Sequence, residues 1–239
     1  MARPAALAAI LPAPGDRHGP LVPMMVALTV LTGVVDAVSY LKLGHVFVAN
    51  MTGNVVFLGF AVAGASGLSV ASSLIALAAF LAGARTGGAI GARLAAHRGH
   101  HLRGAGSLQA VLIAVALLLA VLASTPLAEG ARYAITAVLA LAMGIQNATA
   151  QRLAVPELTT TVLTRTIAGL AGDGGGGETI VTLRRLIAVV AMFLGALAGA
   201  LLALEVSVAA DLGLALALVL ATVLAAHQLS RGAPAWVVP

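Results

Sequence analysis

Two short polar clusters interrupt apolar segments and carry the side chains best suited to binding a ligand. Residues 47–59 read FVANMTGNVVFLG, and residues 159–166 read TTTVLTRT. The polar members of interest are Asn50, Thr52, Gly53, Asn54, Thr161, Thr164 and Arg165. Amides, hydroxyls and a guanidinium recognise polar or anionic solutes through hydrogen bonds and charge. Both clusters are therefore candidate substrate-binding elements.

Two charged residues lie inside runs that otherwise read as membrane spans, Asp36 and Arg85. A charge within a bilayer is costly, so it usually faces the interior of a helix bundle and has a partner. Asp36 lies in GVVDA, and Asn147 occupies the matching place in GIQNA. Two interpretations stay open: Asp36 is a ligand or proton carrier together with Asn147, or it forms a structural pair with Arg85.

The composition places the chain among membrane proteins. Of 239 residues, 61% are hydrophobic and only 9% charged, whereas a soluble domain is about one quarter charged. The absence of cysteine excludes disulfides and zinc-thiolate sites. The basic residues lie at segment ends without interleaved aromatics, which indicates membrane topology and not nucleic-acid binding. No metal or cofactor is expected, and the histidines of HRGHHLRGAGS (97–107) read as part of a solvated basic connector.

Six apolar runs are long enough to cross a bilayer as helices. They cover residues 21–43, 69–92, 107–128, 131–150, 182–204 and 208–228. The two polar clusters fall in shorter segments, about 46–66 and 157–172. The sequence therefore predicts an all-α polytopic membrane protein, with about six transmembrane helices and two broken or re-entrant half-helix segments.

The chain repeats its own plan. GVVDA matches GIQNA, the threonine of NMTGNVV matches that of VLTRTIA, and AFLAGA matches MFLGAL, at offsets of 111 to 113 residues (144 − 33, 164 − 52, 193 − 80). We expect a tail at 1–20, a first membrane repeat at 21–128, a second at 129–229 and a tail at 230–239. With three crossings in each half, the second repeat is inverted relative to the first.

Lysine and arginine positions predict the orientation. If both broken segments return to the side they enter from, the basic residues of the tails and of most connectors fall on one side. These are Arg3, Arg17, Arg93, Arg98, Arg103, Arg152, Arg184, Arg185 and Arg231. Only Lys42 and Arg132 fall on the other side, and Arg85 and Arg165 are intramembrane. We expect a bacterial inner-membrane protein with both termini cytoplasmic.

A helix break is expected at the first polar cluster. Gly53 permits an unusual φ, and Thr52 or Asn54 could cap a half-helix that continues through VVFLGFAV. The positive end of that half-helix would point toward mid-membrane, where it suits an anion or a polar ligand. Thr164 and Arg165 would act similarly in the second half.

Two glycine faces predict close helix packing. Gly83, Gly87 and Gly91 form one face, and Gly195 and Gly199 form the second. Packing within the chain is the simpler interpretation, and homodimerisation is the alternative.

With these motifs in view, the chain resembles the YoaK-like family of bacterial membrane proteins from about Val22 to Leu229. The stretches that carry the resemblance are DA…FVANMTGN and GIQNATAQRL…TTTVLT. The second half has Leu163-Thr164-Arg165 where a Thr-Gly pair is expected. The resemblance implies a polytopic inner-membrane protein and no particular activity.

Three functional hypotheses follow. The first is a transporter or channel, without enzymatic activity, for a small polar or anionic solute that binds where the two broken segments meet. The second is an intramembrane enzyme using Asp36 as acid or base. The third is a membrane scaffold that dimerises through its glycine faces.

Overall fold

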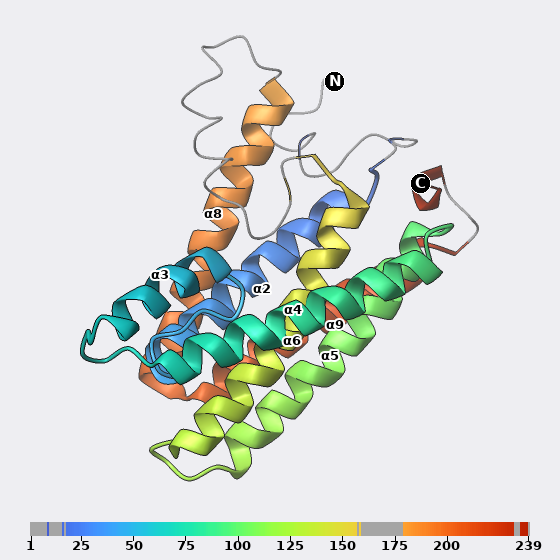
Figure 1. Ribbon diagram of the computed structural model, residues 1–239. Coiled ribbons are helices and arrows are strands. Elements are labelled where there is room, and N and C mark those ends of the chain that lie inside the picture. Colours follow the sequence, from blue (N-terminus) through green and yellow to red (C-terminus); the bar gives the residue numbers. More distant parts are fainter. Residues whose placement is uncertain are drawn as a thin grey trace.

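The computed structural model describes Ala9, Asp16 and residues 18–156, 158, 179–231 and 235–238, and its regular elements there are helices (Figure 1). They are α2 (Leu21–Lys42), α3 (Met51–Val62), α4 (Val70–Arg93), α5 (Arg98–Leu122), α6 (Glu129–Leu153), α8 (Thr179–Leu201), the π-helix η1 (Leu202–Val206), α9 (Val208–Leu229) and the 3₁₀-helix η2 (Ala235–Val237). Within the described residues, six helices are long and apolar enough to cross a membrane, with η1 extending α8. The prediction of an all-α polytopic membrane protein is confirmed.

Side chains cap the start of several helices. An N-cap oxygen or nitrogen accepts the amide hydrogen of the third residue after it, which satisfies one of the amides that a helix start leaves unpaired. The capping residues are Asn50 of α3, Ser69 of α4, His97 of α5 and Ser207 of α9. Local sequence therefore fixes where these four helices begin.

The basic segment 97–107 is not the connector that the sequence predicted. Helix α5 begins at Arg98, and Arg98, Gly99, His101 and Leu102 are buried. A side chain at Gly99 would lie 2.7 Å from Ser230 Cβ and 3.2 Å from the Trp236 ring, so only glycine fits there. Burial against the C-terminal residues makes this polar stretch helical.

The helix ends gather at two ends of the bundle, which we call the Lys42 end and the Arg98 end. The last residues of α2, the residues around the start of α4 and the first turn of α6 line one cavity at the Lys42 end. His18 before α2, the residues after α4, the start of α5 and the end of α6 line another at the Arg98 end. The segment 43–69 therefore leaves and returns at the same end.

Glycines let α4 and α6 touch through their backbones. A Cβ atom at Gly83 would lie 2.1 Å from the Leu141 carbonyl oxygen, and one at Gly144 would lie 2.1 Å from the Phe80 oxygen. A Cβ at Gly87 would meet the Ile145 oxygen at 2.8 Å. Only glycine leaves room for such contacts, so the first glycine face packs within the chain.

Helices α2 and α8 repeat that crossing. A Cβ at Gly195 would lie 2.1 Å from the Val30 oxygen, one at Gly33 would lie 2.5 Å from the Met192 oxygen, and one at Gly199 would lie 2.7 Å from the Val34 oxygen. Gly33 and Gly144 lie 111 positions apart, and Gly83 and Gly195 lie 112 apart (144 − 33, 195 − 83). The glycines at the two crossings thus match at the offset of the sequence repeat.

The matching contacts fix helix directions. Partners advance together along α2 and α8, from Val30 with Gly195 to Val34 with Gly199, so these two helices run in the same direction. Gly83 with Leu141 and Gly87 with Ile145 show in the same way that α4 and α6 run in the same direction. Both run opposite to α2, because α2 ends and α4 begins at the Lys42 end. Helix α9 ends near the start of α5, because Gly99 adjoins Ser230. Gly19, just before α2, adjoins the Trp236 side chain of η2.

The first prediction concerns the α2–α8 crossing. Gly195→Ala should destabilise the protein by about 2 kcal/mol or more, because the added methyl group has no space beside the Val30 oxygen. Gly213→Ala in α9 is the matched control, since nothing lies within 4 Å of its added Cβ. Thermal unfolding in detergent distinguishes the two. Equal melting temperatures for the two variants would contradict the close crossing.

The second prediction concerns the bundle ends. The chain has no cysteine, so single exposed cysteines report topology cleanly. Ser66→Cys lies in the connector that returns to the Lys42 end, and Ala96→Cys follows α4 at the Arg98 end. An impermeant maleimide added to intact cells should label the first and not the second. Labelling of Ala96→Cys from outside would show that the predicted orientation is wrong.

Candidate functional site

Asp36 holds the segment that follows α2. Its side chain is 5% exposed, and its Oδ1 accepts hydrogen bonds from the Val48 amide at 3.0 Å and the Ala49 amide at 2.9 Å. Gly44 (φ 109°) and His45 (φ 55°) turn the chain back after α2. Asp36 lies six residues before the end of α2, about 9 Å along the axis. The chain thus folds back alongside α2 to this depth before α3 begins.

Asn54 fastens the same segment from the other side. This side chain is fully buried, its Nδ2 donates to the Phe47 carbonyl at 2.6 Å, and its Oδ1 accepts from the Phe47 amide at 2.9 Å. Non-helical backbone inside a membrane protein needs such internal partners. Asp36 and Asn54 together satisfy three of the segment's amides and one of its carbonyls.

The expected break at Thr52-Gly53-Asn54 is wrong by a few residues. The non-helical backbone ends at Asn50, whose side chain caps α3 by accepting from the Gly53 amide at 3.3 Å, and Thr52 is exposed within the helix. Gly53 matters for space and not for φ, because a Cβ there would lie 2.9 Å from the Phe47 ring. The cap is therefore Asn50, upstream of the residues that the sequence suggested.

An aromatic cluster covers this segment. Phe47 stacks on Tyr40 of α2 and on Phe57 of α3, with ring centroids 5.2 and 5.7 Å apart. His45 meets Tyr40 edge to face at 5.3 Å. Helix α3 is 12 residues long, about 18 Å, too short for a bilayer core of about 30 Å. The aromatic rings fix this short helix to α2.

The structural pair of Asp36 with Arg85, one of the two interpretations left open, is not formed in the described structure. Asp36 is buried and bonded to the backbone of its own loop, whereas Arg85 is exposed on α4. Backbone amides, and not a guanidinium, stabilise the carboxylate. Asp36 therefore has a structural role, but its partners are backbone amides and not Arg85.

The second polar cluster can be described only in part. Asn147 is half-buried on α6, six residues before the helix end, as Asp36 is on α2, and it has interactions of its own. Thr161, Thr164 and Arg165 lie outside the described residues. Whether the two clusters meet therefore stays a prediction.

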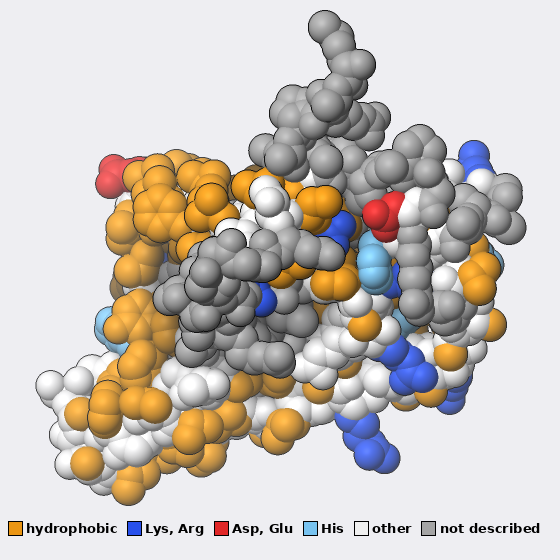
Figure 2. All heavy atoms as spheres, turned by 90° about the horizontal axis from the view of Figure 1, so that it is seen from above, with side chains coloured by type: hydrophobic (Ala, Val, Ile, Leu, Met, Phe, Trp, Pro, Cys, Tyr) orange, Lys and Arg blue, Asp and Glu red, His pale blue; other side chains and the backbone are white. Residues whose placement is uncertain are grey.

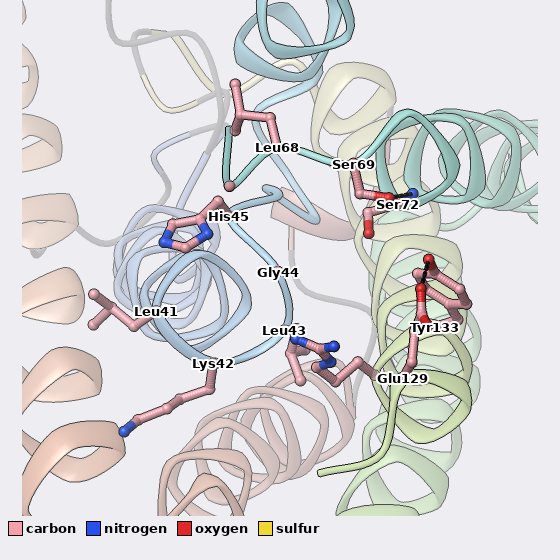
Figure 3. A pocket seen from close by; sticks show the side chains of 12 residues that line it. Leu41, Lys42, Leu43, Gly44, His45, Leu68, Ser69, Ser72, Glu129 and Tyr133 are labelled. Carbon is pink, nitrogen blue, oxygen red and sulfur yellow. Dashed lines mark hydrogen bonds between the residues drawn. The ribbon is translucent and has the colours of Figure 1, made fainter. Parts of the chain in front are cut away.

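A polar cavity of about 370 Å³ opens at the Lys42 end (Figure 3). Ser72, Glu129, Arg132 and Tyr133 contribute polar groups to its lining, and the Tyr133 hydroxyl donates to the Glu129 carboxylate. The Lys42 side chain points away from Glu129 and Tyr133 (Figure 3). Of the residues predicted to bind substrate, none that the structure describes lines this cavity.

The bundle centre holds a chain of buried polar side chains that joins three helices. Gln109 of α5 donates to Gln146 of α6 at 2.7 Å, and Gln146 donates to the Thr32 hydroxyl of α2 at 2.8 Å. Gln146 also donates to the Leu28 carbonyl at 3.2 Å. All three side chains are at most 2% exposed. A cavity of about 10 Å³ adjoins Gln109 and Gln146, and Thr149 and Thr222 also line it.

Sequence reasoning missed this central chain. Gln146 is the neighbour of Asn147 in GIQNA, and Gln109 is a polar residue near the start of an apolar run. An amide within a predicted span is itself a signal, because it needs an internal partner.

The third prediction tests the role of Asp36. Asp36→Ala leaves two buried amides without an acceptor, which should cost about 2–4 kcal/mol of unfolding free energy. Asp36→Asn should be milder, because its amide oxygen can still accept. Adding Arg85→Gln should restore neither variant. Unfolding in detergent measures all three effects. Rescue of either variant by Arg85→Gln would support the Asp36–Arg85 ion pair.

Comparison with known proteins agrees with this architecture. The profile of a family described as a protein of unknown function, DUF1275, matches residues 24–225. The UPF0700 transmembrane protein YoaK of Bacillus subtilis (strain 168) is 34% identical over 151 residues, which cover 62% of this chain and 65% of that protein. The match thus spans less than two thirds of the relative's length, and no solved structure matches the chain. With most of its length matched by the family profile, the chain belongs to the YoaK-like DUF1275 family of membrane proteins.

Proposed function

We propose that this membrane protein is a transporter or channel for a small polar or anionic solute. The passage would run between the four helices α2, α5, α6 and α9, from the Arg98 end to the Lys42 end. The observation that carries the proposal is the buried Gln109–Gln146–Thr32 chain beside a small cavity.

The cost of these polar groups supports a passage. Amides buried among membrane helices need partners, and here α2, α5 and α6 each supply one member of the hydrogen-bonded chain. The adjoining space of about 10 Å³ is near the minimum for one water molecule, and Thr149 and Thr222 add polar groups to its wall. We infer a closed constriction that separates the two end cavities.

We further propose that the two halves form an inverted repeat. Helices α2 and α4 run opposite to their counterparts α6 and α8, and the glycine crossings match at the sequence offset. The segment 43–69, with α3, would be re-entrant, since it leaves and returns at the Lys42 end. Inverted repeats with discontinuous segments are common in transporters.

The Arg98 end would be cytoplasmic in a bacterial inner membrane. The described residues of this end include Arg93, Arg98, Arg103, Arg152 and Arg231, whereas Lys42 and Arg132 lie at the other end. This asymmetry follows the positive-inside rule. Both termini would then be cytoplasmic.

The two alternatives have less support. An enzyme needs a titratable partner within hydrogen-bond reach of Asp36, whereas backbone amides hold Asp36 in the described part of the chain. A glycine-mediated homodimer needs free glycine faces, whereas Gly83, Gly87, Gly195 and Gly199 contact backbone of their own chain. We therefore propose a protein without enzymatic activity.

The fourth prediction tests water access to the passage. Gln109→Cys and Thr149→Cys should react with a small charged methanethiosulfonate reagent in membrane vesicles of at least one orientation. The matched control is Ile113→Cys, one turn from Gln109 on α5, because Ile113 is fully buried in an apolar cluster. If residues 109 and 149 react no faster than residue 113 in either vesicle orientation, the chain is only a helix contact and the passage is wrong.

A further inference from the structure

We propose that the cavity at the Arg98 end is a binding site for a small anion that carries a phosphate or carboxylate group. This inference goes beyond the proposed function, because it concerns binding and does not require that the anion is transported. The cavity measures about 520 Å³. Its described lining is His18, Leu94, Ala95, Arg98, His101, Arg152, Leu153 and Ala154.

The lining collects positive charge. Two arginines and two histidines face the cavity, and its described lining contains no acidic side chain. Asp16 lies close by and accepts from the His18 amide at 2.7 Å, but it does not line the cavity. Figure 2, which shows the molecule from above, places basic and histidine side chains on one part of this face with an acidic side chain among them, beside a largely apolar part. Like charges near a membrane surface favour an anion between them.

Arg98 is held in place by the bundle. Its side chain is 8% exposed, its Nη2 donates to the Leu153 carbonyl at the end of α6, and the same nitrogen lies 3.3 Å from His18 Nδ1. Because an end carbonyl of α6 accepts from it, the guanidinium is fixed at the cavity wall and not free to extend into solvent. The start of α5 adds the positive end of a helix of 25 residues.

His101 supplies a second and independent sign of a ligand. The residue lines the cavity and is 3% exposed, and its Nε2 is buried with no hydrogen-bond partner in the described part of the chain. A buried polar nitrogen without a partner costs free energy, so such groups usually have an occupant to bind. In the neutral tautomer that carries its hydrogen on Nε2, an anion oxygen would supply the acceptor that this N–H group lacks.

Gly91 makes room for this arrangement. A Cβ there would lie 2.6 Å from Arg152 Cδ and 2.9 Å from His101 Nε2. Gly83 and Gly87 on the same face instead contact the backbone of α6. Gly91 thus leaves space for side chains of the cavity, whereas Gly83 and Gly87 allow close packing of α4 on α6. Arg152 is exposed, so it can move onto an incoming anion.

The fifth prediction tests this site with the full-length protein in nanodiscs. In phosphatidylcholine nanodiscs, inorganic phosphate should raise the melting temperature in a saturable way, if the occupant is a free anion. If the occupant is a lipid headgroup, phosphatidylglycerol in the nanodisc should raise it instead. In either case Arg152→Gln should lower the apparent affinity for the anion about tenfold or more, as expected for loss of a charge-assisted hydrogen bond.

The controls distinguish a specific binding site from general electrostatic attraction of anions to this end of the bundle. Arg93→Gln removes an exposed arginine from the same end but outside the cavity lining, and it should leave the affinity unchanged. His101→Gln should weaken binding as Arg152→Gln does. The proposal is overturned if neither phosphate nor phosphatidylglycerol stabilises the protein, or if Arg93→Gln weakens the effect as much as Arg152→Gln.

Discussion

The close approach of helix backbones at glycines is the constraint on which the bundle depends. In a bilayer no hydrophobic force drives helix on helix, so contact must come from tight packing. The α2–α8 and α4–α6 crossings achieve it by placing carbonyl oxygens where a Cβ would otherwise stand. Each crossing joins one helix from each half of the chain. The two halves are therefore interlocked, and neither could keep this packing alone.

The way the chain folds back beside α2 after Lys42 follows from that interlocking. With α2 held against α8, Asp36 presents a fixed acceptor to the Val48 and Ala49 amides. Asn54 then completes the pairing of Phe47, and Asn50 starts α3. Asp36, Asn50 and Asn54 are thus hydrogen-bonded to the backbone beside them, whereas Thr52 is exposed. The free-energy cost of burying Asp36 and Asn54 in the membrane is offset, because they accept hydrogen bonds from amides that would otherwise be unpaired.

The sequence predicted the large-scale plan well, because hydropathy and repeats are properties of whole segments. Five of the six apolar runs match helices to within a few residues, and the glycine faces pack within the chain as expected. The start of α5 was missed because its arginine and histidines look solvated until Trp236 and Ser230 cover the adjacent Gly99. The Asp36 partner was missed because backbone amides are present in every sequence and leave no signal in side-chain types.

The polar groups of the interior differ in how completely they are satisfied, and this difference carries the functional argument. Around Asp36 and Asn54 each hydrogen bond serves the fold. At the centre, Gln109 and Gln146 are bonded to each other yet adjoin a space that polar side chains partly line. At the Arg98 end, His101 has a buried nitrogen with no partner in the described chain. The Lys42 end has unpaired groups of its own, since Thr136 Oγ1 and both Asp211 carboxylate oxygens are buried without a hydrogen-bond partner in the described chain. A fold can tolerate such unpaired groups where an exchangeable partner, either water or an anion, completes the hydrogen bonds that the protein leaves open.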